Sequence, residues 1–437
     1  MMRGPDHENT EPLLLNRAPE TRKDPPMSLL FTPGKIGPLE IKNRFVRAPV
    51  YEGLAESDGA VGDEMLAYHE RLARGGVGLI CTGYMFAAPV GRAQKRQAGI
   101  HCDAMIPGLK KLTDTVHTHG AKIAFEISHA GRQTEKHLIG RNPVGPSRIR
   151  RDPSYFIKPD EMSDAMVRDA VDAFVAAAGR AVEAGSDLVY LHAGGGDLLN
   201  QFLSPFFNVR KDRWGGSDEN RFRILGEIIT GIKEKVSKDV PILVKMNSRD
   251  LTPKQGITLE LARTYTAWLN DLGVNGLELT TGIKFYDHMS CWRGAVPVKE
   301  IVRALPAWKK PVGWLLMKQL EGTRDLIEGW SIEDLKAVKE CAGEMALVIV
   351  GGMRKKAHME AILTEGHADF IALARPLIRQ PAFINRLMEG KTDASSCISC
   401  NRCIGAVMNQ LPAACYRNGL PKGNAAPETP GTTSPPD

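Results

Sequence analysis

Leu347-Val348-Ile349-Val350-Gly351-Gly352 is a continuous apolar run that ends in two glycines. Such a run is typical of a strand buried on both faces of a parallel sheet, because a strand with one face in water alternates apolar and polar residues. Comparable short runs recur along the chain, and together they predict eight strands. The expected strands are Phe45–Ala48, Val77–Thr82, Lys122–Ser128, Asp187–His192, Ile242–Met246, Gly276–Thr281, Leu347–Gly351 and Phe370–Ala374.

Longer amphipathic stretches separate these runs, and several stop at a glycine such as Gly120, Gly185 or Gly273, a common signal for a helix end. The alternation of eight strands with helices predicts a (β/α)8 TIM barrel in the α/β class. A doubly wound sheet would usually carry G-x-G-x-x-G after its first strand, and none follows Phe45–Ala48. The expected helices are Asp63–Arg74, Ile106–Thr118, Ala165–Ala184, Glu219–Lys238, Leu259–Leu272, Ser331–Ala342, Lys355–Glu365 and Pro381–Met388.

The barrel is expected to occupy residues 27–390 of the 437, followed by a short cysteine-rich appendix at residues 391–421. Residues 1–26 are polar and residues 422–437 are rich in Pro, Gly and Thr, so both ends are expected to be disordered. The long stretch 284–329 predicts an insertion over the barrel mouth. Its candidates for lining a pocket are Phe285, Tyr286, Asp287, His288 and Trp292.

The composition is that of an ordinary soluble protein, with 43% hydrophobic and 25% charged residues. No apolar run is long enough to cross a bilayer, and Leu13-Leu14-Leu15 is too short for an export signal, so we expect a cytoplasmic protein without a membrane partner. The net charge of +6 is dispersed, which argues against nucleic acid and suits an anionic cofactor or substrate. The oligomeric state stays open, with a homo-oligomer among the alternatives.

Four of the eight cysteines fall within nineteen residues, in the pattern C-x2-C-x2-C-x11-C. Sulfur ligands gathered in one loop can converge on a soft metal centre, and such a centre in a chain without an export signal suggests electron transfer. A zinc site and a set of reduced structural thiols are the alternatives. The candidate ligands are Cys397, Cys400, Cys403 and Cys415.

Glycine and arginine end the last two expected strands, in Gly351-Gly352-Met353-Arg354 and Ala374-Arg375-Pro376. TIM barrels often bind phosphate after strands seven and eight, where glycines let the backbone approach closely and an arginine can clasp the oxygens. Together with the cysteines, this pattern suggests a bound flavin mononucleotide (FMN). A phosphate-binding barrel of another kind, such as an aldolase, is the competing class.

Long motifs follow one another through the barrel in a fixed order. They run from Asn43 to Pro49 (NRFVRAP), Ser128 to Arg132 (SHAGR), Asn200 to Pro205 (NQFLSP), Trp214 to Ser217 (WGGS), Glu219 to Arg221 (ENR) and Val350 to Gly352 (VGG). Through these motifs the chain resembles the old yellow enzyme family from Leu29 to Met388.

The cysteine run narrows this resemblance to the branch that contains 2,4-dienoyl-CoA reductase and trimethylamine dehydrogenase. In that branch a similar run holds a [4Fe–4S] cluster beside an FMN barrel. Both relatives continue into a further nucleotide-binding region that this sequence does not include. We therefore expect the chain to exchange electrons with a separate redox partner protein.

The resemblance implies an FMN-dependent oxidoreductase that moves a hydride between flavin N5 and an enoyl, enone or CoA-linked substrate. It implies that Lys245 lies near flavin N1 and C2=O, where a cation stabilises the reduced flavin. Glu126 stands where relatives have a glutamine at the flavin pyrimidine, and Tyr51 where they have Thr or Cys near C4=O. His129 and Arg132 either face the site or order a loop. The other implied FMN contacts are Ala48, Pro49 and Val50 through their backbone, and Gly351, Gly352, Ala374 and Arg375 at the phosphate.

The substrate side departs from the family pattern. His192-Ala193-Gly194-Gly195 keeps only the first donor of the usual H-x-x-H or H-x-x-N pair, and Asp197 replaces the tyrosine that commonly delivers a proton. One positioned donor to a developing oxyanion is worth roughly 3 kcal/mol, so carbonyl activation should be weaker. A carboxyl group at Asp197 can relay a proton if the pocket raises its pKa. His192, Asp197 and Tyr51 are the expected catalytic residues.

Three alternatives stay open for the reaction. FMN can be reduced directly by NADH or NADPH, with the cysteines binding zinc or nothing. Asp197 can face a cationic substrate, as in amine oxidation of the dehydrogenase type. The missing second donor is also compatible with a non-catalytic flavin and iron–sulfur subunit that only transfers electrons.

Overall fold

The structure is a computed structural model that describes residues 28–149, 157–283, 293–323 and 325–421. The expected disordered ends, residues 1–26 and 422–437, lie outside the described residues. The pocket candidates Phe285, Tyr286, Asp287, His288 and Trp292 lie outside them as well.

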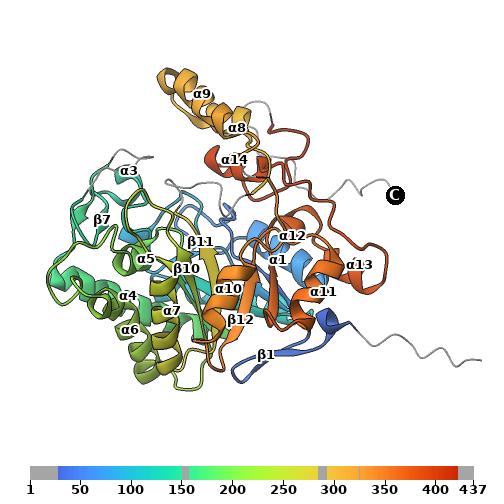
Figure 1. Ribbon diagram of the computed structural model, residues 1–437, viewed down its shortest axis with the longest axis horizontal. Helices are drawn as coiled ribbons and strands as arrows, with labels where there is room; N and C mark the ends of the chain where they lie inside the picture. The colour runs from blue at the N-terminus through green and yellow to red at the C-terminus, as the bar shows by residue number, and fades with distance from the viewer. Residues whose placement is uncertain (1–27, 150–156, 284–292, 324, 422–437) are drawn as a thin grey trace, which may run out of the picture.

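Eight parallel strands close into a barrel, which confirms the predicted fold (Figure 1). Closure comes from the pairing of β4 with β6, which joins the two ends of the sheet. Each expected strand is present, with ends that differ by up to three residues. In ring order the strands are β3 (Phe45–Arg47), β4 (Leu79–Cys81), β6 (Lys122–Ser128), β9 (Leu188–Ala193), β10 (Ile242–Arg249), β11 (Gly276–Thr281), β12 (Ala346–Val350) and β13 (Phe370–Leu373).

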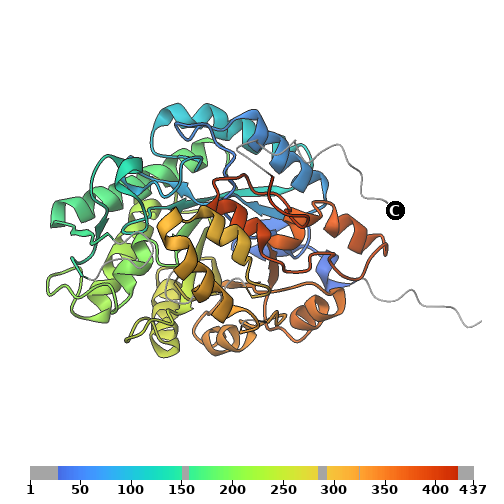
Figure 2. The same cartoon turned by 90° about the horizontal axis from the view of Figure 1, so that it is seen from above.

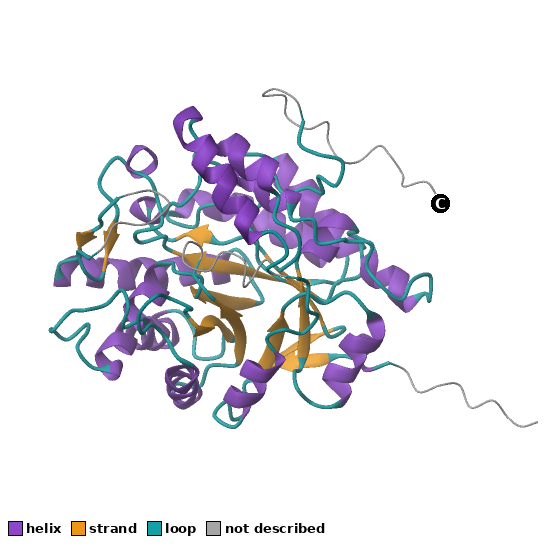
Figure 3. Ribbon diagram, turned by 45° about the horizontal axis from the view of Figure 1, so that its top comes forward, coloured by secondary structure: helices purple, strands orange, loops and turns teal. Residues whose placement is uncertain are grey.

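Helices surround the strands on the outside of the barrel (Figure 3). Ser163, Ser217 and Thr258 cap three of them by accepting a hydrogen bond from the backbone N–H three residues on. The helices of the barrel are α1 (Asp63–Arg74), α2 (Ile106–His117), α4 (Asp164–Glu183), α6 (Asp218–Lys235), α7 (Leu259–Asp271), α10 (Ile332–Lys339), α11 (Lys356–Thr364), α12 (Arg375–Arg379) and α13 (Phe383–Met388).

The apolar core has two layers. A large cluster fills the space between strands and helices, because residues such as Ile228 and Leu269 turn toward the outward side chains of the strands. A smaller cluster fills the barrel interior, with Val46, Leu243 and Phe370 among its members. This inner layer makes the barrel a packed core rather than a pore, so polar chemistry is confined to the strand ends.

Shorter elements decorate the barrel. One hairpin, β1 (Gly34–Ile36) with β2 (Leu39–Ile41), precedes the first barrel strand. The others are η1 (Leu29–Phe31), β5 (Met85–Phe86), η2 (Pro89–Gly91), η3 (Asp103–Met105), α3 (Lys136–Ile139), β7 (Val144–Gly145), β8 (Asp160–Glu161) and α5 (Leu198–Leu203).

The insertion after β11 and the cysteine appendix pack together over the carboxyl ends of the strands (Figures 1 and 2). The insertion contains α8 (Val298–Ala304), η4 (Ala307–Lys309) and α9 (Lys310–Leu320), and the appendix contains α14 (Arg402–Met408). Within the described ranges, no helix combines the length and apolar character needed to span a membrane.

Candidate active site

Three neighbouring strands bring the expected catalytic residue His192 and the expected flavin contact Lys245 into one layer of the barrel with Glu278. Lys245 on β10 is in register with His192 on β9 and with Glu278 on β11. Glu126 lies near the end of β6, which pairs with β9. Because side chains in register on adjacent parallel strands share a face, His192, Lys245 and Glu278 meet at the same height inside the barrel. Glu126 is in register with Tyr190, and its side chain reaches His192 and Lys245 from there.

The meeting groups form a buried line of alternating charge. Lys245 Nζ lies 3.0 Å from Glu278 Oε1 and 3.8 Å from Glu126 Oε1. Glu126 Oε1 is 3.0 Å from His192 Nδ1, and His192 Nε2 is 3.2 Å from Asp197 Oδ2. All three carboxylates are essentially without solvent contact. A buried charge is tolerated only when it is paired, and here each charge has a neighbour of opposite sign.

This pairing sets the protonation of His192. Burial alone lowers the pKa of the imidazole, but the attraction of Glu126 and the contacts with Asp197 outweigh it and raise the pKa to about 9. Burial also raises the pKa of Glu126, and His192 and Lys245 reverse that effect and bring it below its usual range. The pKa of Lys245 is raised because the two glutamates outweigh desolvation. At neutral pH, His192 therefore carries a proton on each ring nitrogen, and each N–H faces a carboxylate.

Two tyrosines extend the site toward the end of β3. The ring of Tyr84 stacks on His192 at a centroid distance of 6.0 Å, and Tyr51 lies 6.4 Å from Tyr84. Burial raises the pKa of both phenols, that of Tyr84 well above its usual value. Both tyrosines are consequently neutral and can donate a proton or a hydrogen bond. Tyr84 is a site residue that the sequence did not single out.

A polar hub holds the loop that carries Asp197. Asp250 is completely buried and accepts hydrogen bonds from Asn247, Asn200 and the Ile257 N–H at 2.8–3.2 Å. Asn247 also accepts a hydrogen bond from the Gly195 N–H at 2.9 Å. The loop after β9 is thus fixed from β10, so the separation of His192 and Asp197 is set by the fold rather than by a flexible loop.

A second buried cluster fixes the loop after β3, which carries Tyr51. Glu52 pairs with Arg47 at 2.8 Å and with His69 at 3.2 Å, and it accepts the Gly83 N–H at 2.9 Å. Burial raises the pKa of Glu52, but its cationic neighbours reverse this and lower it to about 2. These contacts hold the segment of Ala48, Pro49 and Val50 against the barrel rim.

His129 and Arg132 order a loop. The His129 Nδ1 atom accepts a hydrogen bond from the Gly131 N–H at 3.0 Å, and burial lowers the pKa of the ring to about 4. The Arg132 guanidinium lies 5.0 Å from the centre of the Phe207 ring, and its backbone N–H binds Gln201. Of the two interpretations that the sequence allowed for this motif, these contacts support loop ordering.

The glycine pair after β12 is required by its backbone conformation and by close packing against residues 327–331. Gly351 and Gly352 have φ values of +152° and +72°. A Cβ atom at Gly352 would lie 2.6 Å from the Ile327 carbonyl oxygen, so no other residue fits there without a shift. The backbone N–H groups of this turn and of the start of α12 at Ala374 and Arg375 are the groups that could face a phosphate.

The two strand-end arginines contact the cysteine appendix and the insertion. Arg354 donates to Ser399 Oγ at 2.8 Å and to the Cys397 carbonyl at 3.2 Å. Arg375 Nη1 donates to the Arg293 carbonyl at 2.8 Å and to Asn401 Oδ1. Both arginines therefore tie the cysteine appendix and the insertion to the barrel. A contact of Arg375 with the FMN phosphate stays a prediction. Its backbone N–H and its remaining guanidinium nitrogens are the groups that would make this contact.

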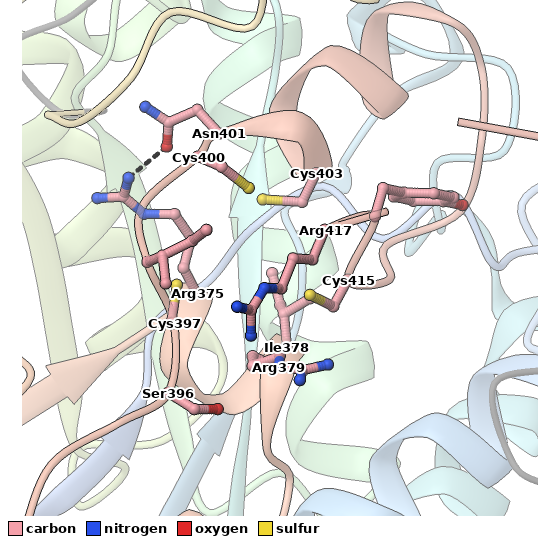
Figure 4. Close-up of a pocket in the computed structure, with 12 residues that line it drawn as sticks. Arg375, Ile378, Arg379, Ser396, Cys397, Cys400, Asn401, Cys403, Cys415 and Arg417 are labelled. Atoms are coloured by element: carbon pink, nitrogen blue, oxygen red, sulfur yellow. Dashed lines mark hydrogen bonds between the residues drawn. The ribbon is translucent and has the colours of Figure 1, made fainter. Parts of the chain in front are cut away.

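The four candidate cysteines line one pocket that opens to solvent (Figure 4). The sulfur atoms of Cys400 and Cys403 point toward one another. Burial and the neighbouring thiols raise the pKa of Cys403 to about 12, although Arg375 acts in the opposite direction. Across the described ranges, no three His, Cys, Asp or Glu side chains already stand as a metal-binding group. The donor set nevertheless has the chemistry of a soft metal site.

The residues at the barrel mouth fit FMN. Lys245 supplies a buried cation, the turn after β12 supplies backbone donors, and Glu126 Oε1 has ion-pair neighbours without hydrogen-bond geometry. A flavin pyrimidine offers an N–H to such a carboxylate and a C2=O to such a lysine.

Two participants were missed by sequence reasoning, Tyr84 and Glu278. Tyr84 comes two residues after the predicted strand Val77–Thr82, and Glu278 is a lone charge inside the strand Gly276–Thr281. A charge in a strand buried on both faces requires a partner of opposite sign. That signal was present in the sequence and would have linked Glu278 to Lys245.

Comparison with known proteins identifies the family of the chain. Residues 29–300 match the model of the NADH:flavin oxidoreductase / NADH oxidase family. A 4,4′-dithiodibutanoate disulfide reductase of Rhodococcus erythropolis is 31% identical over 387 residues, which covers 87% of this chain and 94% of that protein. An NADH oxidase of Thermoanaerobacter brockii is 34% identical over 396 residues, which is 89% of this chain but 56% of that protein. The chain thus spans about half the length of the latter relative.

Solved structures show the same fold. A 2-naphthoyl-CoA reductase complex superposes with a TM-score of 0.76 at 25% identity, over 89% of this chain and 56% of that chain. An old yellow enzyme homologue from Zymomonas mobilis superposes with a TM-score of 0.66 at 23% identity, over 85% of this chain and 95% of that chain. From the family match and the Rhodococcus relative together, the chain belongs to the NADH:flavin oxidoreductase / NADH oxidase family.

Proposed function

We propose that the chain is an FMN-dependent oxidoreductase that acts on an enoyl, enone or CoA-linked substrate. When bound, FMN supplies the hydride acceptor and donor at its N5 atom. The cysteine appendix is proposed to hold a [4Fe–4S] cluster that exchanges electrons with a second protein. Such thiol ligands belong in a reducing compartment, and we propose that the protein works in the cytoplasm.

One observation supports this function above the others, the buried pair of His192 and Asp197. His192 holds a proton at Nε2, 3.2 Å from Asp197 Oδ2, and Glu126 keeps the ring charged through Nδ1. A proton stored between an imidazole and a carboxylate can be given to or taken from a substrate carbon or oxygen. The pair thereby replaces the tyrosine donor that the motif lacks.

The pairing of Asp197 also decides between substrate classes. An aspartate that recognises an amine must offer its charge to the incoming cation. Asp197 already neutralises His192 at 3.2 Å and is completely buried. The charge of Asp197 is therefore already neutralised by His192, which favours a neutral acceptor such as an enoyl group over an amine. The 2-naphthoyl-CoA of the structurally similar reductase complex is a CoA-linked compound of the favoured kind.

Lys245 and Glu126 are the proposed flavin contacts with opposite effects. Lys245 is proposed to stabilise negative charge at flavin N1 and C2=O, and its own charge is secured by Glu278 at 3.0 Å. Glu126 is proposed to accept the N–H of the pyrimidine. The backbone at Ala48, Pro49 and Val50 and the phosphate turn at Gly351 and Gly352 would fix the rest of the cofactor.

The substrate class is tested by anaerobic turnover of the flavin-loaded protein with paired probes. We expect the reduced protein to be reoxidised by an enoyl-CoA thioester, and we expect the oxidised protein not to be bleached by a primary or tertiary amine. An Asp197→Asn variant should keep its flavin and lose about two orders of magnitude in the rate of enoyl-CoA reduction, because it cannot pass a proton. Bleaching of the oxidised protein by an amine, at a rate comparable to that of reoxidation by the enoyl-CoA thioester, would contradict the assignment of an enoyl substrate.

NADH is a second candidate for the reductant of FMN, beside a partner protein. Two findings favour it, the family description and the NADH oxidase relative. Stopped-flow mixing of the air-free protein with NADH or NADPH separates it from an obligatory protein partner. Rapid loss of flavin absorbance with either nucleotide would establish direct reduction and would remove the need for a partner. Slow loss with both supports the relay through the cysteine appendix.

A further inference from the structure

The insertion after β11 exposes an unusual amount of apolar surface. Met317 and Leu320 of α9 pack on Val298 and Ile301 of α8. The rest of α9 and η4 turns outward, and no described residue of α9 is buried. This outward surface, which we name the α8–α9 face, carries Trp308 (77% exposed), Val312 (63%), Trp314 (49%), Leu315 (54%) and Leu316 (52%).

Scattered exposed apolar residues are ordinary, whereas a cluster with two tryptophans marks a contact site. The hairpin of α8 and α9, which carries these residues, projects from the barrel (Figure 1). Exposure of this kind in a described, helical segment indicates that another molecule covers it.

Positive charge borders the same face. Arg303, Lys309, Lys310 and Lys318 belong to the hairpin, and the Lys309 and Lys318 ammonium groups lie 5.0 Å and 5.9 Å from the centres of the Trp308 and Trp314 rings. The hairpin acids Glu300 and Glu321 are already paired, with Arg402 at 3.2 Å and Lys318 at 2.7 Å. Glu321 offsets the charge of Lys318, but lysine and arginine still outnumber the acids of the hairpin. We call this excess of positive charge beside the apolar centre the basic rim. Such a rim complements an acidic surface.

The face is attached directly to the cysteine appendix. Asn409 of α14 donates to the Glu300 carbonyl at 2.8 Å, and a Cβ atom at Gly405 would lie 2.5 Å from Glu300 Cβ. Asn401 donates to the Ala295 carbonyl, and the Ala295 N–H donates to the Ser399 carbonyl, each at 3.0 Å. In the view from above, α8, α9 and α14 lie beside one another over the barrel (Figure 2). A molecule bound to the face would thus contact the hairpin whose helix α8 packs on α14, the helix that contains Cys403.

We propose that the α8–α9 face docks a small acidic electron-carrier protein. The charge rim selects an acidic partner, and the contact with the appendix explains why that partner carries electrons. A second copy of this chain would bring two basic rims together, which costs binding energy. A membrane could bind the face without any contact between the hairpin and the cysteine appendix, so membrane binding would leave that contact unexplained. The inference rests on the proposed role of the cysteines as an electron relay.

The test measures binding rather than turnover. Full-length, anaerobically purified protein is titrated by calorimetry with two acidic probes, a flavodoxin and a [2Fe–2S] ferredoxin. We expect at least one probe to bind in the micromolar range and to bind about tenfold more weakly at high salt, because salt screens the rim. The triple variant W308S/W314S/L315S and the double variant K309E/K310E should each weaken binding about tenfold or more.

Matched controls come from elsewhere on the surface. M388S removes an apolar side chain of similar exposure (59%) from the end of α13, and K110E/K111E reverses two adjacent exposed lysines of α2. Both controls should bind like the unchanged protein. The changed side chains are exposed, apart from Lys309, which is partly exposed, so the thermal midpoint should stay the same. A face variant with a shifted midpoint is excluded, and the comparison then uses the other face variant.

Each remaining outcome overturns the proposal. These outcomes are no binding of either probe, equal loss in the control variants, binding to phosphatidylglycerol vesicles through the same side chains, or a dimer that the triple variant dissociates. A Cys397→Ser variant separates this inference from the proposed relay. It should bind the probes unchanged while losing iron, so absence of iron in the unchanged protein would defeat the relay without altering the binding result.

Discussion

His192 is held between two carboxylates, and that arrangement makes its charge depend on the fold. Its pKa rises from 6.5 to about 9 because Glu126 and Asp197 outweigh desolvation. A group with a raised folded-state pKa stabilises the protein below its unfolded pKa and loses that contribution as the pH rises through the folded value. The stabilisation from His192 is thus complete below about pH 6.5 and disappears through about pH 9.

Removing the charge of Glu126 should shift this titration. In Glu126→Gln the imidazolium loses the neighbour 3.0 Å from Nδ1, so the His192 pKa should fall toward its ordinary value. The alkaline limb of the pH profile of kcat/KM should move down by at least one pH unit, with flavin content retained. Glu64→Gln, at an exposed carboxylate, serves as the control and should leave the profile in place. An unchanged alkaline limb in Glu126→Gln would show that His192 does not govern the rate.

Substitution of Glu278 tests the buried ion pair that Glu278 forms with Lys245 behind the site. Its side chain is fully buried and lies 3.0 Å from Lys245 Nζ, so Glu278→Gln leaves the lysine with one glutamate at 3.8 Å. We expect a loss of about 3 kcal/mol in the free energy of unfolding, measured in urea. The double variant Glu278→Leu with Lys245→Met should be less destabilised than the single one, because no unpaired charge remains. Equal losses in both would refute the pairing as the cause.

At the scale of elements, the strands were predictable because their burial dictates their composition. All eight predicted strands are present, and β6 and β11 have the predicted ends. The helical hairpin of α8 and α9 was not predicted beyond an insertion, because its amphipathic pattern leaves an apolar side in solvent. The contacts of Arg354 and Arg375 with the appendix could not be predicted from the sequence either. Their partners in the appendix lie 26 to 45 positions away, and sequence spacing does not reveal such contacts.

The cysteine appendix has no large core of its own, and its attachment to the barrel depends on a few polar contacts. Arg354 reaches both the Cys397 carbonyl and Ser399 Oγ from the end of β12. In Arg354→Lys these forked contacts cannot both form. We expect faster hydrogen exchange over residues 391–421, measured by mass spectrometry, and a lower iron content per chain.

The matched variant for this experiment is Arg263→Lys, which alters an arginine between α7 and α10 on the outside of the barrel. It should leave both exchange and iron content unchanged. If Arg354→Lys exchanged no faster than the unchanged protein, the appendix would be held by other contacts.

At the scale of the whole molecule, the barrel mouth should couple folding to FMN. A ligand that binds only the folded state stabilises it by RT ln(1 + [L]/Kd), about 2.7 kcal/mol at one hundred times Kd. Thermal unfolding of flavin-free protein with added FMN should therefore show a midpoint several degrees higher. Riboflavin, which lacks the phosphate, should raise the midpoint much less if Gly351 and Gly352 hold that group. Equal shifts would contradict the phosphate turn.

The central claim is that one chain joins an FMN barrel to a redox cluster at Cys397, Cys400, Cys403 and Cys415. It is tested most directly by the visible spectrum of the anaerobically purified protein, together with its FMN, iron and acid-labile sulfide contents. We expect flavin bands with a broad shoulder in the blue, and about one FMN, four iron atoms and four sulfides per chain. A colourless protein would contradict the flavin, and a yellow protein with zinc or no metal would contradict the cluster.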